Sequence, residues 1–412
     1  MTVRSRAVTR VLLIGGRHPA AARAAREAGL QVHYLGVREG APAWLATGSD
    51  EATLLDDPAP DTVISAAKTI HAEQPFGVAV SMSDAYVEAA AVINESLGLP
   101  GNSPGVPRAV NDKARMREIL HDSAVGAVIA ARVSTADEVQ GFAAEMGYPF
   151  VLKPVDGSGS RGVTLVRDED GLVDAVARTV GATAAADPES VWIAEEYLRG
   201  PEFSVETFST DGTHHLLSVT EKFKGPNFVE IGHLVPARVS ADVVRGMTAE
   251  VSACLDAVGL TEGPAHTEIV LTARGPRVVE THCRPGGGGI VELVRLAVGL
   301  DVQRITFDWL AGRPLNLDGA AEPQGAATWF LTPGAGTVSS VSGLDEVLSA
   351  EGVTEVYDTV APGAVIGELR SSSDRAGAVI ATGDTPDEAL RRAREAVGRL
   401  EVTVEPTQAP TS

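Results

Sequence analysis

The first quarter of the chain alternates between short apolar runs and stretches with helical spacing, and this alternation restricts the possible folds more than any other feature. "RVLLIGG" (residues 10–16) is a continuous apolar run ending in glycines, "AAARAAREAGL" (residues 20–30) has helical periodicity, and "QVHYLG" (residues 31–36) is apolar again. Strand, helix and strand in this order form a βαβ unit. Because the alternation continues to about Gly101, residues 1–110 are predicted to form a doubly wound α/β domain.

The composition favours a globular protein and excludes several function classes. A chain of 412 residues has room for about two to four domains. Its net charge of −21 argues against a nucleic-acid-binding surface, which needs a basic face. The sequence has no apolar run long enough to span a membrane, and Cys254 and Cys283 are too few for a disulfide framework. The turn at Gly15 and Gly16 lacks the G-x-G-x-x-G pattern of dinucleotide sites. We therefore expect a cytoplasmic protein that binds neither nucleic acid nor membrane.

The stretch "VLKPVDGSGSRGVTLV" (residues 151–166) combines a buried-looking strand, a lysine and a loop of small residues. Small residues let successive backbone N–H groups approach a ligand closely and cradle phosphate oxygens. Lys153, in the preceding strand, can reach the same phosphates as a point charge. The alternative is a plain β-hairpin with a solvated lysine, and this stretch alone does not decide between the two.

Two acidic segments follow that stretch. In "AEEYLRGPEFSVE", Glu202 begins an alternating strand. "TEIVLT" and "PRVVETH" flank turn residues and predict an antiparallel hairpin, on which Glu268 and Glu280 project from one face. Two facing carboxylates are oxygen ligands suited to Mg²⁺, although a solvated charged edge is the alternative. Arg284 then precedes four glycines, where an arginine fork suits a phosphate or carboxylate. A single helix is expected over residues 289–312.

The order of these motifs resembles the ATP-grasp superfamily of carboxylate–amine ligases. "NDKARM", "VLKPVDGSGSRGV", "EEYLRGPEFSV", "TEI" and "ETHCR" carry the resemblance, which covers about residues 1–310. "EEYLRGPEFSV" is similar to the hinge of D-alanine–D-alanine ligase-like enzymes. The C-terminal block resembles the tail domain of L-amino-acid (dipeptide) ligases, which is the subfamily we favour.

The resemblance implies an α/β ATP-grasp fold with three parts. Residues 1–110 would form the N-terminal doubly wound domain, and residues 111–315 the ATP-grasp domain. The latter would divide into a lid-bearing subdomain (111–200) and a metal and substrate subdomain (201–315). Residues 325–402 would form a small α+β domain.

The resemblance also assigns roles to residues by position. Those that would bind ATP, at its phosphates, adenine or ribose, are Lys113, Lys153, Ser158, Gly159, Ser160, Gly162, Glu195, Tyr197, Leu198 and Glu202. Those that would bind Mg²⁺, or Mn²⁺ in its place, are Glu268, Glu280 and His282. Those that would act on the reacting groups are Arg284, His233 and Lys153.

One motif departs from the superfamily pattern. The usual E-x-N-x-R reads Glu280-Thr281-His282-Cys283-Arg284 here, so that an imidazole replaces an amide oxygen. Because Mg²⁺ prefers oxygen ligands, three roles stay open for His282: weak metal binding, contact through water, or contact with the substrate. The number of metal ions stays open with it.

The function that the resemblance implies is ATP-dependent joining of a carboxylate to an amine through an acyl phosphate. The product would be a dipeptide or an amino-acid amide, with ADP and phosphate released. Partners would be ATP and small amino acids, and homodimers are common among such ligases. Two alternatives are an ATP-grasp carboxylase-type enzyme that uses bicarbonate, and a nucleotide-binding protein with reduced catalysis.

Overall fold

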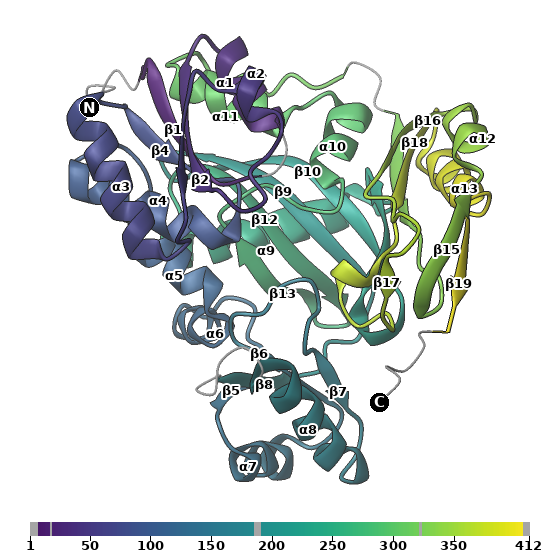
Figure 1. The fold of residues 1–412 in the computed structure, drawn as a ribbon. Helices are drawn as coiled ribbons and strands as arrows, with labels where there is room; N and C mark the ends of the chain where they lie inside the picture. The colour runs from purple at the N-terminus through teal and green to yellow at the C-terminus, as the bar shows by residue number, and fades with distance from the viewer. Residues whose placement is uncertain (1–6, 17–18, 185–190, 321–323, 407–412) are drawn as a thin grey trace, which may run out of the picture.

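The fold is described from a computed structural model of the chain. It describes residues 7–16, 19–184, 191–320 and 324–406. Figure 1 shows an N-terminal α/β unit, a long central sheet, a small lower subdomain and a C-terminal block beside the central sheet. Within the described ranges, no helix combines the length and the apolar composition that crossing a bilayer requires.

The N-terminal unit is a parallel sheet with helices on both faces. Its strands, in spatial order, are β3 (Glu51–Leu55), β2 (Gln31–Val37), β1 (Arg10–Ile14) and β4 (Val78–Val80). Its helices are α1 (Ala20–Glu27), α2 (Leu45–Gly48), α3 (Pro60–Glu73) and α4 (Asp84–Leu97). Val11 and Leu13 pack toward α1, whereas Leu12 and Ile14 pack toward α3 and α4. The predicted doubly wound arrangement is confirmed.

The lower subdomain is an antiparallel sheet packed against two helices. Its strands, in spatial order, are β5 (Ala130–Val133), β8 (Trp192–Glu196), β6 (Phe150–Pro154) and β7 (Thr164–Val166). The helices are α7 (Ala136–Met146) and α8 (Asp170–Ala184). Thr135 and Glu138 form the capping box at the start of α7. Helices α5 (Gly105–Asn111) and α6 (Lys113–Asp122) join this subdomain to the N-terminal unit.

The central sheet has eight antiparallel strands. In spatial order they are β13 (Gly275–His282), β12 (Gly263–Thr272), β9 (Glu202–Thr210), β10 (Thr213–Lys224), β11 (Glu230–Val235), β14 (Gly325–Phe330), β18 (Ala378–Gly383) and β16 (Val353–Tyr357). A short 3-10 turn, Pro226–Phe228, precedes β11. The β12–β13 hairpin confirms the prediction and places Glu268 opposite Glu280.

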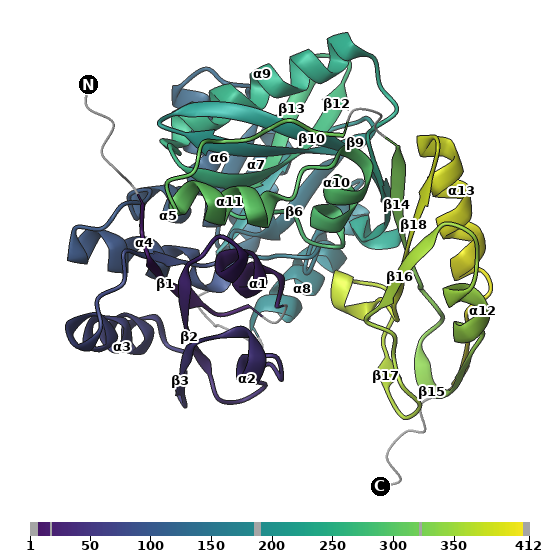
Figure 2. The same ribbon diagram turned by 90° about the horizontal axis from the view of Figure 1, so that it is seen from above.

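Helices cover the two faces of the central sheet. Helix α9 (Ala241–Val258) packs against one face, and α10 (Ile290–Val298) packs against part of the other (Figure 2). Helix α11 (Val302–Leu310) bridges to the N-terminal unit, where Phe307 joins the core around α1. The single helix expected over residues 289–312 is therefore wrong.

That expected helix divides at a glycine. Gly299 has a φ of +75° and ends α10, because a left-handed residue cannot continue the helical hydrogen-bond ladder. Asp301 then caps α11 by accepting hydrogen bonds from the N–H groups of Gln303 and Arg304, each at 3.0 Å. A glycine followed two residues later by an aspartate is the sequence signal for such a division.

The C-terminal block shares its strands between two sheets. Three of them, β14, β16 and β18, extend the central sheet, and a separate small sheet has the order β17 (Val365–Ile366), β15 (Gly336–Ser342) and β19 (Glu401–Glu405). The helical segments are α12 (Leu344–Leu348), α13 (Pro386–Val397) and the 3-10 turn Ser372–Asp374. The block is α+β, and it is continuous with the site-bearing sheet rather than attached by a linker alone.

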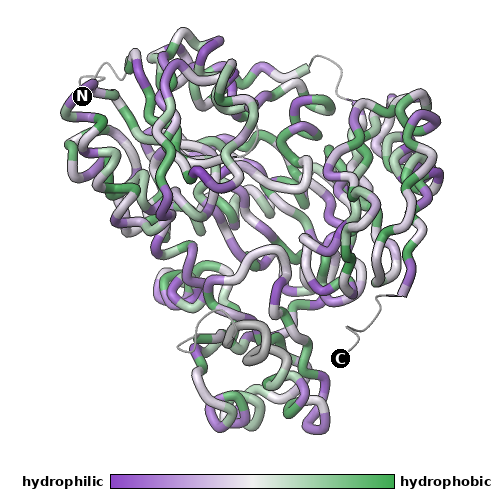
Figure 3. Tube along the Cα trace, in the orientation of Figure 1, coloured by the Kyte–Doolittle hydropathy of each residue, from purple (hydrophilic) through white to green (hydrophobic). Residues whose placement is uncertain are grey.

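Strand β9 explains how the central sheet supports a site. Its sequence EFSVETFST is buried over eight of nine residues, and apolar and polar residues alternate along its first half. Figure 3 shows hydrophilic and hydrophobic residues interspersed along the described part of the chain. Phe203 and Val205 pack against α9. Because successive side chains of a strand point to opposite faces, Glu202, Ser204 and Glu206 project together on the face opposite α9. That face forms one wall of a cavity.

Candidate active site

A cavity of about 320 Å³ lies where the central sheet, the β6–β7 loop, the N-terminal unit and the C-terminal block meet. The predicted site residues that line it are Lys113, Lys153, Ser158, Gly159, Ser160, Glu195, Tyr197, Leu198, Glu202, His233, Glu268, Glu280, His282 and Arg284. Gly162 belongs to the same loop but does not line the cavity. The structure thus brings nearly all of the predicted residues together, while their individual roles stay predictions.

The sheet wall of the cavity is a grid of polar side chains. Register pairs place Glu280 beside Glu268, His282 beside His266, and His266 beside Glu206. The rings of His266 and His282 stack with centroids 5.9 Å apart. The pleat of neighbouring strands therefore gathers ionisable groups that are far apart in the sequence.

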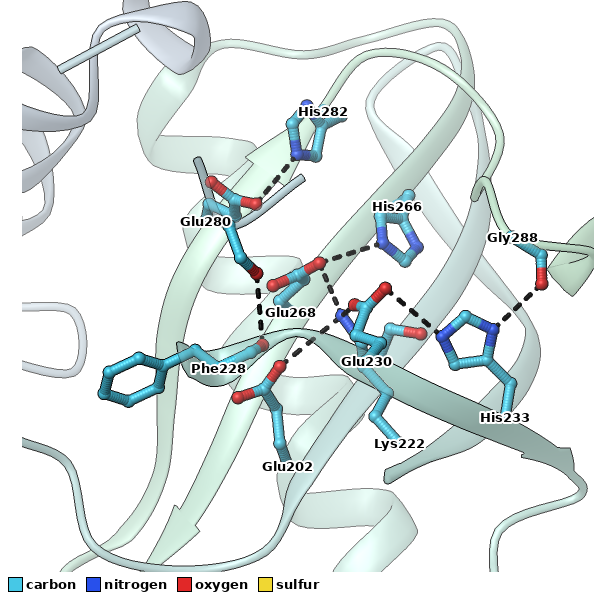
Figure 4. A network of polar contacts seen from close by, with 12 residues as sticks. Glu202, Lys222, Phe228, Glu230, His233, His266, Glu268, Glu280, His282 and Gly288 are labelled. Atoms are coloured by element: carbon cyan, nitrogen blue, oxygen red, sulfur yellow. Dashed lines mark hydrogen bonds and ion pairs between the residues drawn. The ribbon is translucent and has the colours of Figure 1, made fainter. Parts of the chain in front are cut away.

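Lys222, on β10, is the centre of this grid and was missed by the sequence analysis. Its side chain is fully buried, and its Nζ lies 2.5 Å from Glu268, 3.5 Å from Glu202 and in contact with Glu230 (Figure 4). Burial lowers the pKa of Lys222, but the three carboxylates outweigh it and raise this pKa well above its ordinary value. The three glutamates also come close enough to one another to hold a cation.

Glu268 and Glu280 face each other at the β12–β13 hairpin. Glu280 lies 2.9 Å from Lys113, and Glu268 contacts Lys222. Burial raises the pKa of both carboxyls, but the facing lysines hold both pKa values below the ordinary range. Both groups are therefore ionised oxygen donors, and this donor set fits Mg²⁺ or Mn²⁺.

His282 lies between two carboxylates. Its Nδ1 is 3.1 Å from Asp84 at the start of α4, and its Nε2 is 3.4 Å from Glu280. Burial lowers the pKa of His282, but hydrogen bonds to Asp84 and Glu280 raise it overall. Both ring nitrogens already lie beside carboxylates, which favours contact with the substrate or with water over direct metal binding. Its assignment as a ligand stays a prediction.

His266 was also missed, although it lies two residues before Glu268 on the same face. Its Nδ1 is 2.8 Å from Glu206, and its Nε2 is 3.5 Å from Glu268. Burial lowers the pKa of His266, but Glu206 outweighs this and raises it to about 9. A buried imidazolium thus orients the Glu268 carboxylate. A histidine at spacing i−2 from a metal-type glutamate was the available sequence signal.

Glu195 is held by two cations. Lys153 contacts one carboxylate oxygen, and Nε of Arg117 donates to the other at 3.0 Å. Arg117, on α6, also donates to the carbonyl oxygens of Val278 and Val279 on β13. The side chain of Glu195, predicted to meet adenine, therefore points toward the lysine end of the cavity and fixes Lys153. Its adenine contact stays a prediction.

The β6–β7 loop, Gly157–Gly162, is called the flap below. Lys113 Nζ donates to the Gly157 carbonyl at 2.5 Å, and Ser160 Oγ donates to the Phe228 carbonyl at 3.1 Å. The Ser372 N–H donates to the Gly159 carbonyl at 2.9 Å. The flap thus lies against the central sheet and the C-terminal block, in a closed position over the cavity.

Two further cavity residues, Asp84 and Arg375, come from the N-terminal unit and from the C-terminal block. Asp84 accepts a hydrogen bond from Arg284 at 2.5 Å, and its pKa lies well below the ordinary range because bonds to His282 and Arg284 outweigh burial. Arg375 follows the 3-10 turn of the C-terminal block and also lines the cavity. Neither residue lies in a motif, so no local pattern in the sequence pointed to them.

Most of the residues that line the cavity lie in two segments that match known domain families. Residues 146–292 match the ATP-grasp domain, and residues 329–405 match L-amino acid ligase C-terminal domain 2. The chain is 27% identical over 262 residues to an alanine–anticapsin ligase of Bacillus subtilis strain 168, which covers 58% of this chain and 56% of that protein. It is 25% identical over 307 residues to an L-arginine-specific L-amino acid ligase of Bacillus subtilis, with 73% of each chain covered.

A solved structure supports the same assignment at the level of the fold. The crystal structure of an L-amino acid ligase from Bacillus licheniformis superposes with a TM-score of 0.85. The superposition covers 96% of this chain and 99% of that one, at 24% identity. The chain therefore contains an ATP-grasp domain over residues 146–292 and an L-amino acid ligase C-terminal domain over residues 329–405.

Proposed function

We propose that this protein is an ATP-dependent ligase that converts a carboxylate to an acyl phosphate and joins it to the amine of an amino acid. The observation that carries the proposal is the single cavity in which Lys113, Lys153 and the flap face Glu268 and Glu280. Cations, a closing glycine loop and a pair of ionised carboxylates are the parts that phosphoryl transfer from ATP needs. The family matches at residues 146–292 and 329–405 support the amino-acid substrate class.

In this proposal the lysine end of the cavity binds the triphosphate. Lys113 joins the flap to Glu280, so the ammonium lies between the loop and the carboxylate pair. Glu268 and Glu280 would hold Mg²⁺, which when bound offsets negative charge on the phosphates. Glu202, at the start of β9, would hydrogen-bond the ribose, and the backbone at Tyr197 would lie beside the adenine.

The chemistry then proceeds in two transfers. An oxygen of the donor carboxylate attacks the γ-phosphorus, ADP leaves, and the acyl phosphate forms. The amine of the acceptor attacks the acyl carbon, and the resulting oxyanion collapses with loss of phosphate. Arg284, held by Asp84 at 2.5 Å, supplies a fixed positive charge near these oxygens.

His233 serves as a positioning residue in this scheme. Its Nδ1 lies 3.0 Å from the Gly288 carbonyl oxygen, which can only accept, so Nδ1 is the donor of this hydrogen bond. Its Nε2 is buried 3.4 Å from the Glu230 carboxylate and makes no hydrogen bond within the described residues. The ring therefore fixes the glycine-rich loop 286–289 against β11.

The closed flap has a chemical purpose in this scheme. Acyl phosphates react with water, and a loop that closes over the cavity excludes it. The three contacts of the flap join it to α6, to the turn before β11 and to the C-terminal block. Closure would therefore bring α6, the central sheet and the C-terminal block together around the cavity.

The test is phosphate release from ATP and Mg²⁺ with a panel of paired amino acids, combined with mass spectrometry of the products. We expect phosphate release that depends on the amino acids, and a dipeptide or amino-acid amide for at least one pair. A Glu280→Gln variant should lose turnover by about 10³-fold, because a metal contact contributes several kcal/mol. Phosphate release that requires bicarbonate, or ATP binding without turnover for any pair, would contradict the proposal.

A further inference from the structure

Arg375 differs from most of the other positively charged side chains that line the cavity, because they lie beside carboxylates. Four cavity cations each lie within ion-pair distance of a carboxylate, namely Lys113 with Glu280, Lys153 with Glu195, Lys224 with Glu202, and Arg284 with Asp84. Among the described residues, none is a carboxylate partner at that distance for Arg375. Arg161, on the flap, is exposed to solvent, whereas Arg375 is half-buried.

The surroundings of Arg375 leave its charge uncompensated. Its Cζ lies 3.7 Å from the centroid of the Phe330 ring. Its Nε donates to the Ser372 carbonyl at 2.9 Å, and one terminal nitrogen donates to the Glu230 carbonyl at 3.4 Å. A guanidinium has five N–H donors, and these two hydrogen bonds use only two of them. Burial, the largest influence, lowers the pKa of Arg375, and nearby Glu230 only partly offsets it.

A cation that is withdrawn from water and faces a substrate cavity is a binding site for an anion. An arginine fork matches a carboxylate with two parallel hydrogen bonds. A partly buried charge without a carboxylate partner is unfavourable. An anionic ligand would therefore gain more binding free energy at Arg375 than at a cation that is already paired with a carboxylate. Phe330 fixes the plane of the guanidinium by stacking against it.

The reaction itself decides which substrate supplies that anion. The donor carboxylate is consumed, since it is phosphorylated and becomes the amide. An acceptor amino acid keeps its carboxylate from encounter to product. A permanent carboxylate anchor therefore serves the acceptor. Resting on the ligase function proposed above, we infer that Arg375 binds the α-carboxylate of the acceptor amino acid and makes the enzyme select amino acids over simple amines.

The position of Arg375 fits that role. The Phe330 ring that it covers also makes an edge contact with His233, with centroids 5.5 Å apart. His233 in turn holds the carbonyl of Gly288, in the loop that follows Arg284. An acceptor held at Arg375 would therefore lie beside the glycine-rich loop and the reacting groups, with its amine two bonds from the anchored carboxyl carbon.

The same residue links the acceptor to the flap. Arg375 donates to the carbonyl of Ser372, and the N–H of Ser372 donates to the flap at Gly159. Asn227, before β11, also donates to the carbonyl of Leu369 in the same C-terminal loop at 2.9 Å. Acceptor binding and flap closure thus share one short chain of hydrogen bonds.

The experiment compares two acceptors on four proteins, the wild type and three variants. The acceptors are an amino acid that the wild type accepts and its carboxamide, which keeps the amine and loses the negative charge. The variants are Arg375→Gln and Arg375→Lys, with Arg370→Gln as the matched control. Arg370 lies in the same loop, is exposed and pairs with Glu368 outside the cavity.

We expect Arg375→Gln to raise KM for the amino acid about 10- to 100-fold, as loss of a charge-assisted hydrogen bond predicts. The KM for the carboxamide and for the donor should change less than about 3-fold, and Arg375→Lys should recover part of the loss. Arg370→Gln should behave as the wild type. Thermal melting shows whether Arg375→Gln folds. If it does not, the KM values of Arg375→Lys for the two acceptors are compared with those of the wild type instead.

Two results separate failure of this inference from failure of the ligase assignment. If the wild type forms amides and Arg375→Gln affects both acceptors equally or neither, the acceptor anchor is wrong while the ligase function stands. If the wild type forms no amide with any pair, the ligase function is wrong. In that case calorimetric titration of amino acids into protein loaded with a non-hydrolysable ATP analogue still tests whether Arg375 binds a carboxylate. Loss of amino-acid binding in Arg375→Gln would support the anion site. Equal binding by the wild type and Arg375→Gln would overturn it.

Discussion

The N-terminal sheet and the central sheet bury their strands in different ways. Strand β1 has the sequence RVLLI and buries four consecutive apolar residues, two toward each layer of helices. Strand β9 buries eight of its nine residues, and several of them are ionisable or polar. One sheet is covered by apolar packing on both faces, whereas the other packs one face against α9 and shares the opposite face between α10 and the cavity.

The difference shows what each sheet contributes. Apolar burial is non-directional and stabilises the N-terminal unit whatever its ligands. The cavity face of the central sheet is stable only because its charges compensate one another in pairs and clusters, as around Lys222. The same groups that stabilise this face are those that we expect to bind ligands.

The largest expected effect comes from removing the central charge of the cavity face. Lys222→Met leaves Glu202, Glu230 and Glu268 without their shared cation, so the free energy of unfolding should fall by about 3–5 kcal/mol. Chemical denaturation measures this loss. Lys224→Met is the matched control, because Lys224 lies on the same strand, is partly exposed and forms its ion pair with Glu202. This variant should lower the free energy of unfolding by about 1 kcal/mol or less. An equal loss of unfolding free energy in the two variants would contradict the expected difference between the buried Lys222 and the partly exposed Lys224.

A smaller effect is expected in the apolar sheet. Leu12→Ala removes a fully buried side chain packed toward α3 and α4, and should lower the free energy of unfolding by about 3 kcal/mol through lost burial and a residual cavity. The dissociation constant for ATP should stay within about 2-fold of the wild-type value, because Leu12 lies outside the cavity. Denaturation and nucleotide titration test both parts. A large loss of ATP affinity would show that the two sheets are coupled rather than independent.

The smallest expected effect concerns the two cysteines, Cys254 on α9 and Cys283 directly after β13, which both pack on the α9 side of the central sheet. Burial raises the pKa of both Cys254, in the α9 core, and Cys283, between His282 and Arg284, to about 12. Neither thiol should form thiolate at about pH 8, so alkylation of the folded protein should be at least about 100-fold slower than that of a free thiol. Mass spectrometry before and after unfolding measures it. Rapid alkylation of Cys283 alone would mean that the packing between the end of β13 and the α9 core is open to the reagent.

Most of the fold could be predicted from the sequence where local patterns decide the structure. The βαβ alternation, the Thr135 capping box and the β12–β13 hairpin follow from periodicity, caps and turns, and the structure contains all three. The division of the expected helix at Gly299 was missed because an apolar helical pattern continues across the glycine. The joining of three C-terminal strands to the central sheet could not be predicted, since it depends on β14 pairing with β11, where Val235 lies beside Ala326, 91 residues later in the chain, and such a pairing leaves no local pattern.

The site divides in the same way. Lys153, Glu268 and Glu280 lie in motifs, and the structure brings them to one cavity. Lys222 and Arg375 lie in no motif, and their importance appears only when the sheet registers and the C-terminal loop bring them to the same place. Buried charge compensation is a property of the assembled fold, so a sequence pattern can indicate the ligands of a site more readily than the residues that balance them.

The central claim is that this cavity transfers the γ-phosphoryl group of ATP to a substrate carboxylate. A donor amino acid labelled with ¹⁸O in its carboxylate tests it most directly, with ATP, Mg²⁺ and an acceptor present and the released phosphate examined by mass spectrometry. The account predicts one labelled oxygen in each phosphate released, because the bridging oxygen of the acyl phosphate stays with phosphorus when the amine attacks carbon. Phosphate without label, formed in the presence of both substrates, would mean that water attacks ATP instead and would contradict the account.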